Sequence, residues 1–217
     1  MTPTPASEDV EALWLATVQR ALGRASHDVK DALNGVSVNL EVVRSRAARP
    51  GVPASGVAAF AEAAAQQLER LTTLIEAVLT LGRAERDPVD VAVTMRRIAT
   101  ICGASSSSGD AEVVVDVEDV ESAVTSVRGD AVRLALAAPL LELVQGSDRQ
   151  SRVSPVRCVV RATSDGTVVI IAADGRRAVM PAAAASAVRA AGVRWSEGGQ
   201  GTAGPRTNDL SLVFPRA

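Results

Sequence analysis

The chain is poor in the residues that most often carry chemistry. Among its 217 residues there is one histidine, one lysine, two cysteines and no tyrosine, and aromatic residues make up 2%. A lone histidine and two distant cysteines, without CxxC spacing, argue against a zinc-type metal site. With so few rings, the core must be built from Ala, Val, Leu and Ile, and the chain is long enough to bury one.

Several kinds of partner and location are also disfavoured by what is missing. The formal net charge is −2, so there is no basic excess of the kind that binds nucleic acid. The N-terminus has no basic and apolar leader pattern, and no run of about 18 apolar residues could span a bilayer. We therefore expect a cytoplasmic protein without membrane contact, in which Cys102 and Cys158 are reduced thiols rather than a disulfide.

Two long helical patterns dominate the first part of the chain. The first runs from about residue 7 to residue 46, and the second from about 57 to 83, with a break rich in proline and glycine at 48–56. Such a pair predicts an antiparallel hairpin, and one hairpin cannot bury both apolar stripes, so we expect a homodimeric four-helix bundle. The predicted stripes, spaced by three and four residues, are Val29, Leu33, Val36, Leu40 and Val43, and Phe60, Ala64, Leu68, Leu71, Ile75 and Val78.

The pattern changes after a predicted hinge at 82–88. We expect a helix over 89–101, a loop at 105–110, strands at 112–117 and 123–128, and a helix over 130–144 that Pro139 should kink or break. Strands at 156–162 and 167–173 flank Asp165-Gly166, a hairpin signal. A helix over 181–191, a loop at 195–209 and a strand at 210–214 complete the chain. The predicted fold class is α+β: a helical hairpin in residues 1–85, then a small α/β sandwich in residues 86–217.

The single histidine lies on a polar face of the first predicted helix. An imidazole is a nucleophile whose charge can change near neutral pH, and a nearby carboxylate can fix its tautomer. Asp28, the next residue, is the candidate for that role, and an ordinary exposed histidine on a charged helix is the plain alternative. The face predicted from helical spacing comprises Arg20, Arg24, His27, Asp31 and Asn34, with Lys30 beside it.

The segment SHDVKDALNGVSV resembles the H-box of bacterial two-component histidine kinases. By that resemblance His27 is the phospho-acceptor and Asp28 assists proton handling. Asp31 stands where kinases that also dephosphorylate their partner often carry Asn or Thr, and Ala32 stands where proline is usual. The resemblance implies a dimeric four-helix bundle followed by a domain similar to the kinase ATP-binding domain.

The second part of the chain resembles that ATP-binding domain with its nucleotide boxes degraded. Residues 127–144 are similar to the N-box stretch, but apolar residues such as Leu140 and Val144 replace the expected asparagines. Residues 168–178 keep Asp174 and Gly175 of the adenine box, and Arg176 then breaks it. The glycine cluster at 198–204 follows a helix and does not open one, which disfavours a phosphate loop. We expect no bound nucleotide or metal.

Together these features predict a histidine phosphotransferase that relays a phosphoryl group between response-regulator receiver domains through His27. The receiver, including that of a hybrid histidine kinase, would supply the Mg²⁺, and Arg20, Arg24, Lys30, Asp31 and Asn34 would contact it. The first alternative is an inactive pseudo-histidine kinase that binds and sequesters a signalling partner. An autokinase with unusual boxes and a helical scaffold without a signalling role are the others.

Overall fold

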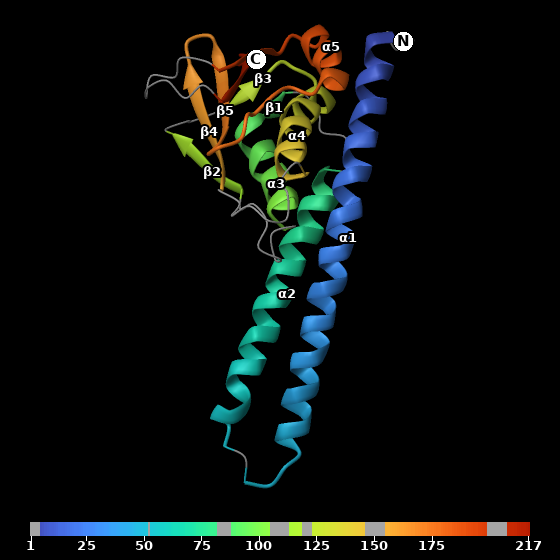
Figure 1. The fold of residues 1–217 in the computed structure, drawn as a ribbon, viewed down its shortest axis with the longest axis vertical. Helices are drawn as coiled ribbons and strands as arrows, with labels where there is room; N and C mark the ends of the chain where they lie inside the picture. Colours follow the sequence, from blue (N-terminus) through green and yellow to red (C-terminus); the bar gives the residue numbers. More distant parts are fainter. Residues whose placement is uncertain are drawn as a thin grey trace.

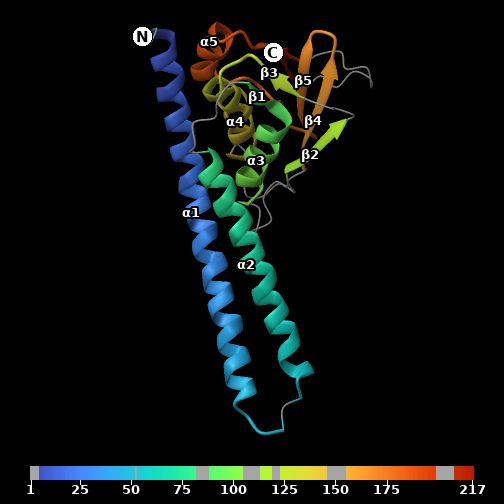
Figure 2. The same cartoon turned by 180° about the vertical axis from the view of Figure 1, so that it is seen from behind.

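The first structural unit is a long helical hairpin. A computed structural model describes residues 5–51, 53–81, 88–104, 113–118, 123–145, 155–198 and 208–217. Helix α1 (Pro5–Ala47) and helix α2 (Ser55–Leu81) run antiparallel and side by side, with their connection at the end far from the rest of the chain (Figures 1 and 2). Both predicted helices are confirmed, each to within two residues of its predicted ends.

The two helices of the hairpin approach each other closely at Gly35. A Cβ atom at this position would lie 2.5 Å from the side-chain amide of Gln67 on α2. The same amide accepts a hydrogen bond from Asn39 Nδ2 at 3.4 Å. Near the connection, the Arg46 guanidinium stacks over the ring of Phe60 and donates to the carbonyl of Gly56 at 2.9 Å. Polar contacts thus supplement a narrow apolar seam in this hairpin.

The predicted apolar stripes divide into two sets. On α1, Val29, Val36 and Val43 are half-buried, whereas Leu33 and Leu40 are exposed. On α2, Ala64 and Leu71 are buried, whereas Leu68 and Ile75 are exposed. A seven-residue repeat on one helix can face only one neighbour at a time, so the second set points away from the hairpin.

The C-terminal part is a mixed α/β unit, which confirms the predicted fold class. Its five-stranded sheet has the order β2-β4-β5-β7-β6, in which β2 and β4 are parallel and the other pairs antiparallel. A two-stranded sheet pairs β1 with β3. The elements are β1 (Val89–Asp90), α3 (Val91–Ala104), β2 (Val113–Glu118), β3 (Val124–Thr125), α4 (Gly129–Gln145), β4 (Val156–Thr163), β5 (Gly166–Ala173), α5 (Ala182–Ala190), β6 (Arg194–Glu197) and β7 (Leu210–Pro215).

Two local predictions were wrong, each for a tertiary reason. Val89 and Asp90 form a strand because they pair with β3, and helix α3 starts after Asp90, whose Oδ1 accepts from the amide of Val93. Residues 194–197 are a strand, not a loop, because β7 pairs with them. Of the two outcomes predicted at Pro139, a kink or a break, the break is absent: helix α4 continues through Pro139, since every residue from 131 to 141 is buried and packing holds the helix together. The predicted hinge at 82–87, the loop at 105–110 and the glycines at 199–204 lie outside the described residues.

The predicted hairpin turn at Asp165-Gly166 is confirmed and depends on glycine. Strands β4 and β5 pair from Thr163 and Gly166 onward, so Ser164 and Asp165 form the turn. Gly166 has a φ of +138°, and a Cβ there would lie 2.0 Å from the carbonyl oxygen of Phe214 on β7. Any side chain at this position would separate the two strands.

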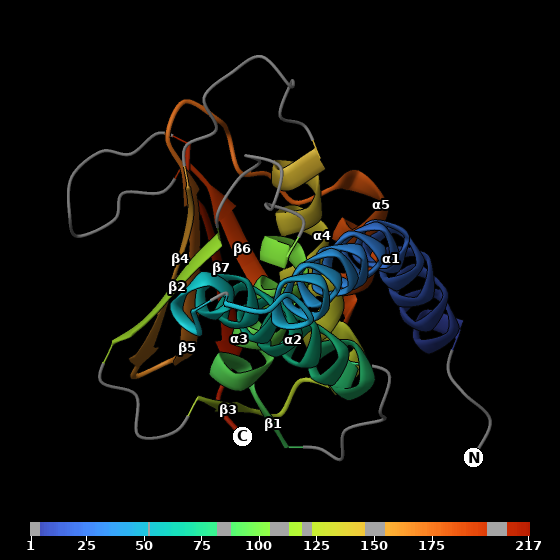
Figure 3. The same ribbon diagram turned by 90° about the horizontal axis from the view of Figure 1, so that it is seen from below.

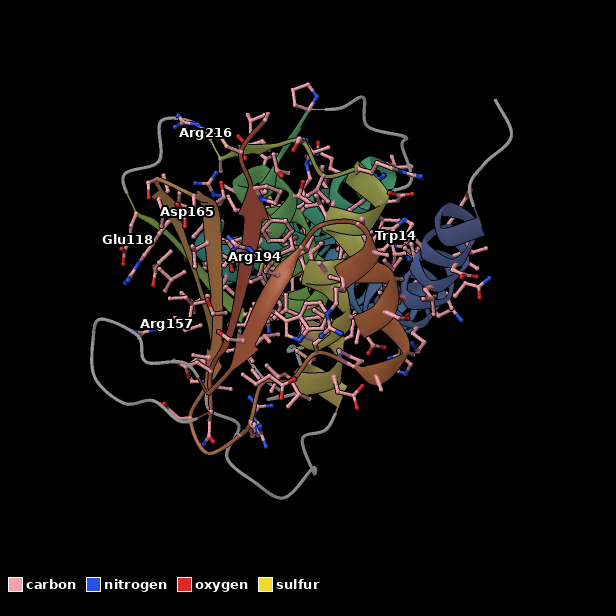
Figure 4. The ribbon with its side chains drawn as sticks, turned by 90° about the horizontal axis from the view of Figure 1, so that it is seen from above. Trp14, Glu118, Arg157, Asp165, Arg194 and Arg216 are labelled. Atoms are coloured by element: carbon pink, nitrogen blue, oxygen red, sulfur yellow. The ribbon has the colours of Figure 1, made fainter. Side chains whose placement is uncertain are left out.

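The C-terminal part and the hairpin share one core. Helices α3 and α4 lie between the large sheet and the N-terminal half of α1, which forms an outer layer (Figures 1 and 3). Leu210, Leu212 and Phe214 of β7 are fully buried on the helix side of the sheet. Trp14 lies between α1 and α4, where the guanidinium of Arg133 sits 5.5 Å from its ring (Figure 4). With Val10 and Thr17 also buried, the upstream part of α1 packs as a helix of the C-terminal unit.

Candidate functional site

His27 lies on α1 just beyond the part that packs against the C-terminal unit. Val10, Trp14 and Ala21 belong to the shared core or pack against it, whereas the His27 side chain is 77% exposed. At this exposure the imidazole is accessible to a second macromolecule. Sites that enclose small substrates are typically concave and largely buried, unlike an exposed helix face.

The imidazole has a carboxylate partner one turn further along the helix. Nδ1 of His27 lies 3.1 Å from Oδ2 of Asp31, and both side chains are exposed. In a neutral imidazole that donates Nδ1–H to such a carboxylate, Nε2 carries the free lone pair and is the nucleophilic nitrogen. Asp28 is the residue predicted from sequence to fix the tautomer, and because its side chain is not among those described, that role stays a prediction.

The other residues of the predicted face are exposed where they are described. Arg20, Lys30 and Asn34 are all exposed on α1, and the side chain of Arg24 lies outside the described side chains. Arg20, His27 and Asn34 are spaced by seven residues, so they follow one line along the helix. Arg20 and Lys30 thus place two cations within about two turns of the imidazole.

An apolar position on the same side of α1 was missed by the sequence reasoning. Val38 is 63% exposed and follows His27 by three helical turns, which returns it to the side of the imidazole. The sequence contained a signal for this position, because Val38 is an apolar residue on the polar face and belongs to neither predicted apolar stripe. We define the His27 face as Arg20, His27, Lys30, Asp31, Asn34 and Val38.

A separate apolar stripe runs along both helices of the hairpin. It comprises five large side chains, each between 44% and 59% exposed: Leu33, Leu40, Leu68, Ile75 and Leu79. Helical spacing places Leu33 and Leu40 on a different side of α1 from His27. The exposed apolar side chains of α1 and the His27 face therefore lie on different sides of that helix.

The region that resembles a nucleotide site is filled by the chain itself. Leu140 and Val144 of α4 are buried in the core, where the resemblance places asparagines. Arg176 Nη1 donates to the carbonyl of Leu143 at 2.6 Å, and its partial burial lowers the pKa of the Arg176 guanidinium. The remaining cavity is about 260 Å³, lined by Pro139, Glu142, Leu143, Arg176, Arg177 and Val179. Ligand pockets usually exceed about 300 Å³.

The remaining reactive groups offer little further chemistry. Within the described ranges, no group of three or more His, Cys, Asp or Glu side chains could hold a metal ion. Cys102 and Cys158 are both buried, and burial together with the nearby Cys102 thiol strongly raises the pKa of Cys158, which keeps it protonated. Among the described helices, none combines the length and apolar character needed to cross a membrane.

Comparisons with known proteins return similarities of structure. No protein-family model matches the sequence, and no curated protein matches it. The histidine kinase domain of the blue-light-activated histidine kinase EL346 of Erythrobacter litoralis is 15% identical, with a TM-score of 0.45 over 91% of this chain and 94% of that one. The Acinetobacter baumannii histidine kinase AdeS is 11% identical, with a TM-score of 0.40 over 87% of this chain and 97% of that one. A bacterial phosphotransferase is 13% identical, with a TM-score of 0.39 over 98% and 97% of the two chains.

Proposed function

We propose that this protein is a histidine phosphotransferase that accepts a phosphoryl group from one receiver domain on His27 and passes it to another. The observation that carries the proposal is the His27–Asp31 pair, which lies exposed on a polar helix face within a segment similar to a kinase H-box. An exposed nucleophile with an orienting carboxylate suits a phosphoryl donor presented on another protein surface.

The transfer itself would be a simple exchange of bonds. Nε2 of His27 attacks the phosphorus of an aspartyl phosphate in line, an N–P bond forms, and the P–O bond to the receiver's carboxylate breaks. The ring then carries the phosphoryl group on Nε2 and a proton on Nδ1, and the Asp31 carboxylate stabilises the resulting positive charge. Arg20 and Lys30 would lie near the transferring oxygens, and the receiver would bring its own Mg²⁺.

The donor would be another protein, because the described part of the C-terminal unit offers no ready nucleotide site. Arg176 ties the segment after β5 to the end of α4, and the cavity beside it is small. The residues at the N-box positions are apolar and buried, so they provide no ligands for a metal-bound triphosphate. ATP-dependent charging of His27 by its own chain is therefore disfavoured.

We further propose that the apolar stripe of Leu33, Leu40, Leu68, Ile75 and Leu79 is covered by a second copy of the chain. Two hairpins packed through this stripe form a four-helix bundle, the arrangement predicted from sequence. The two-fold symmetry buries the apolar stripe of each copy against that of the other and leaves both His27 faces exposed. The dimer would thus carry two reactive sites.

The test uses the fact that the chain has a single histidine. Full-length protein without a histidine tag is incubated with a panel of purified receiver domains from the same organism, each charged with acetyl phosphate. Acid-labile, base-stable phosphate on the intact protein indicates a phosphoramidate, and its loss in His27→Ala assigns it to His27 and not to Lys30. We expect labelling of the wild type and none of His27→Ala, with circular dichroism confirming that the variant is folded.

Two other outcomes would favour the alternatives. Binding of a receiver that His27→Ala leaves intact, without any phosphohistidine in the wild type, would replace the proposal by a sequestering pseudokinase. Labelling of His27 by ATP and Mg²⁺ alone would establish an autokinase, and we expect neither labelling nor a thermal shift at millimolar ATP.

A further inference from the structure

The reactive side of α1 continues upstream into a groove formed with the C-terminal unit. The groove has a volume of about 600 Å³ and lies between α1, α4 and α5, lined among others by Leu13, Thr17, Arg20, Leu134, Ala138 and Ala183. A second hollow of about 510 Å³ shares Leu13 and Ala183 and extends the first along α5 toward Ala190. We call the two together the α1–α5 groove.

The α1–α5 groove and His27 lie on one line of the helix. Leu13 and Arg20 line the groove, and His27 follows at the same seven-residue spacing, which keeps all three on one side of α1. Leu13 lies about 20 Å from His27 along the helix, and Arg20 about 10 Å. A receiver-sized domain of about 120 residues has a radius of gyration of about 14 Å, so one centred at His27 reaches the groove.

The lining of the groove indicates what it would accept. Arg20 is the only charged residue among those that line the larger hollow, and it lies at the end nearest His27. The α5 wall of the smaller hollow consists of small residues, three alanines and Ser186, which let a helix approach closely, and Asp9 lines the far end of that hollow on α1. The fitting occupant is therefore an apolar helix face with an acidic residue at the end that meets Arg20.

We propose that the α1–α5 groove is a second docking surface for the phosphoryl-carrying receiver domain, and that it takes one apolar helix of that domain. The proposal rests on the proposed phosphotransfer function. It assigns the degenerate C-terminal unit a specific task, because α5 forms the wall that makes a groove out of a bare helix.

Two adjacent exposed alanines on α5 provide a matched pair for the test. Ala183 lines both hollows, whereas Ala182 is equally exposed and lines neither. For each variant, two rates of His27 labelling are measured: one with the receiver that labels the wild type, and one with phosphoramidate, a small phosphoryl donor that needs no docking. The first rate is divided by the second. We expect Ala183→Arg to lower this ratio at least tenfold through a higher KM, and Ala182→Arg to change it less than twofold.

The outcomes separate the two proposals. A ratio for Ala183→Arg within twofold of wild type, repeated with Ala16→Arg on the opposite wall, would overturn the groove as a docking surface and leave phosphotransfer intact. Equal losses in Ala182→Arg and Ala183→Arg would also overturn it, since general disturbance of α5 would then explain both. If phosphoramidate labels the wild type and no receiver in the panel does, the proposed phosphotransfer function is wrong. The proposal that the groove binds a receiver domain is then overturned with it.

Discussion

The upstream and downstream halves of α1 belong to one uninterrupted helix and have opposite surroundings. Upstream, Val10 and Thr17 are buried, and Trp14 packs against the C-terminal unit. Downstream, large apolar side chains such as Leu33 and Val38 are exposed, and so is His27. The upstream half buries apolar residues against the C-terminal unit, although Leu15 is exposed, whereas the downstream half leaves several of its large apolar side chains exposed.

This difference separates residues that hold the fold from residues that meet partners. Burial of an apolar side chain against its own chain contributes to the free energy of unfolding, and exposure of the same kind of side chain contributes nothing until a partner covers it. Substitutions along a single helix should therefore change stability in one half and association or transfer in the other.

The largest effect is expected from Trp14→Ala in the upstream half. Removing the ring leaves a cavity beside α4 and removes the contact with the Arg133 guanidinium, so the free energy of unfolding should fall by about 3 kcal/mol. Urea unfolding at fixed protein concentration measures the loss. Val38→Ala in the downstream half is the control and should stay within about 0.5 kcal/mol. Equal losses in the two variants would remove the distinction between the halves.

The next effect concerns the apolar stripe of the hairpin. Leu68→Asp places a charge where we propose that two copies meet, and it should weaken the dimer by about 2 kcal/mol, roughly thirtyfold in its dissociation constant. Sedimentation equilibrium provides the measurement. Gln66→Glu adds a charge to an exposed polar position of the same helix and should leave the dimer intact. A wild-type chain that is monomeric throughout would contradict the assignment of the stripe.

A smaller effect is expected at the reactive pair. Asp31→Asn keeps the shape of the side chain and removes the charge that faces Nδ1 of His27, so the rate of labelling by a phospho-receiver should fall about tenfold. The unfolding free energy should remain unchanged because both side chains are exposed. An unchanged rate would assign the orienting role elsewhere, with Asp28→Asn as the variant to compare.

The smallest effect is expected from an ion pair near the far end of the hairpin. Arg44 Nη2 lies 2.9 Å from Glu41 Oε1, and both side chains are largely exposed. Glu41→Gln should change the free energy of unfolding by less than about 0.5 kcal/mol, since exposed pairs of this spacing contribute little. Thermal unfolding checks this, and a loss comparable to that of Trp14→Ala would show that the downstream half also holds the fold.

The hairpin could be predicted from sequence because its signals are local. Apolar residues at three-four spacing and the proline and glycine break at 48–56 are sufficient to place both helices. The sequence did not predict which residues of each stripe would be buried between the two helices and which would be exposed. That split depends on which side of α1 meets α2, and the close approach at Gly35 helps to fix this side.

The elements that were missed depend on partners far away in the sequence. Strand β1 exists because Val89 and Asp90 meet β3, and strand β6 exists because polar residues at 194–197 pair with β7. Of the site, His27 and its exposed neighbours follow from sequence, and the Asp31 contact follows from the spacing of residues one turn apart. The α1–α5 groove could not be predicted, since it requires the position of α5 against α1.

Because α1 is one unbroken helix, the number of residues between Trp14 and His27 determines the direction in which His27 points relative to the core. Each inserted or deleted residue turns everything downstream by about 100° around the helix axis. A single insertion would swing His27 away from the line of the groove while Trp14 stayed in the core. An insertion of seven residues would restore the direction to within about 20° and move the histidine outward by about 10 Å. This stretch should therefore tolerate substitutions more readily than changes in length.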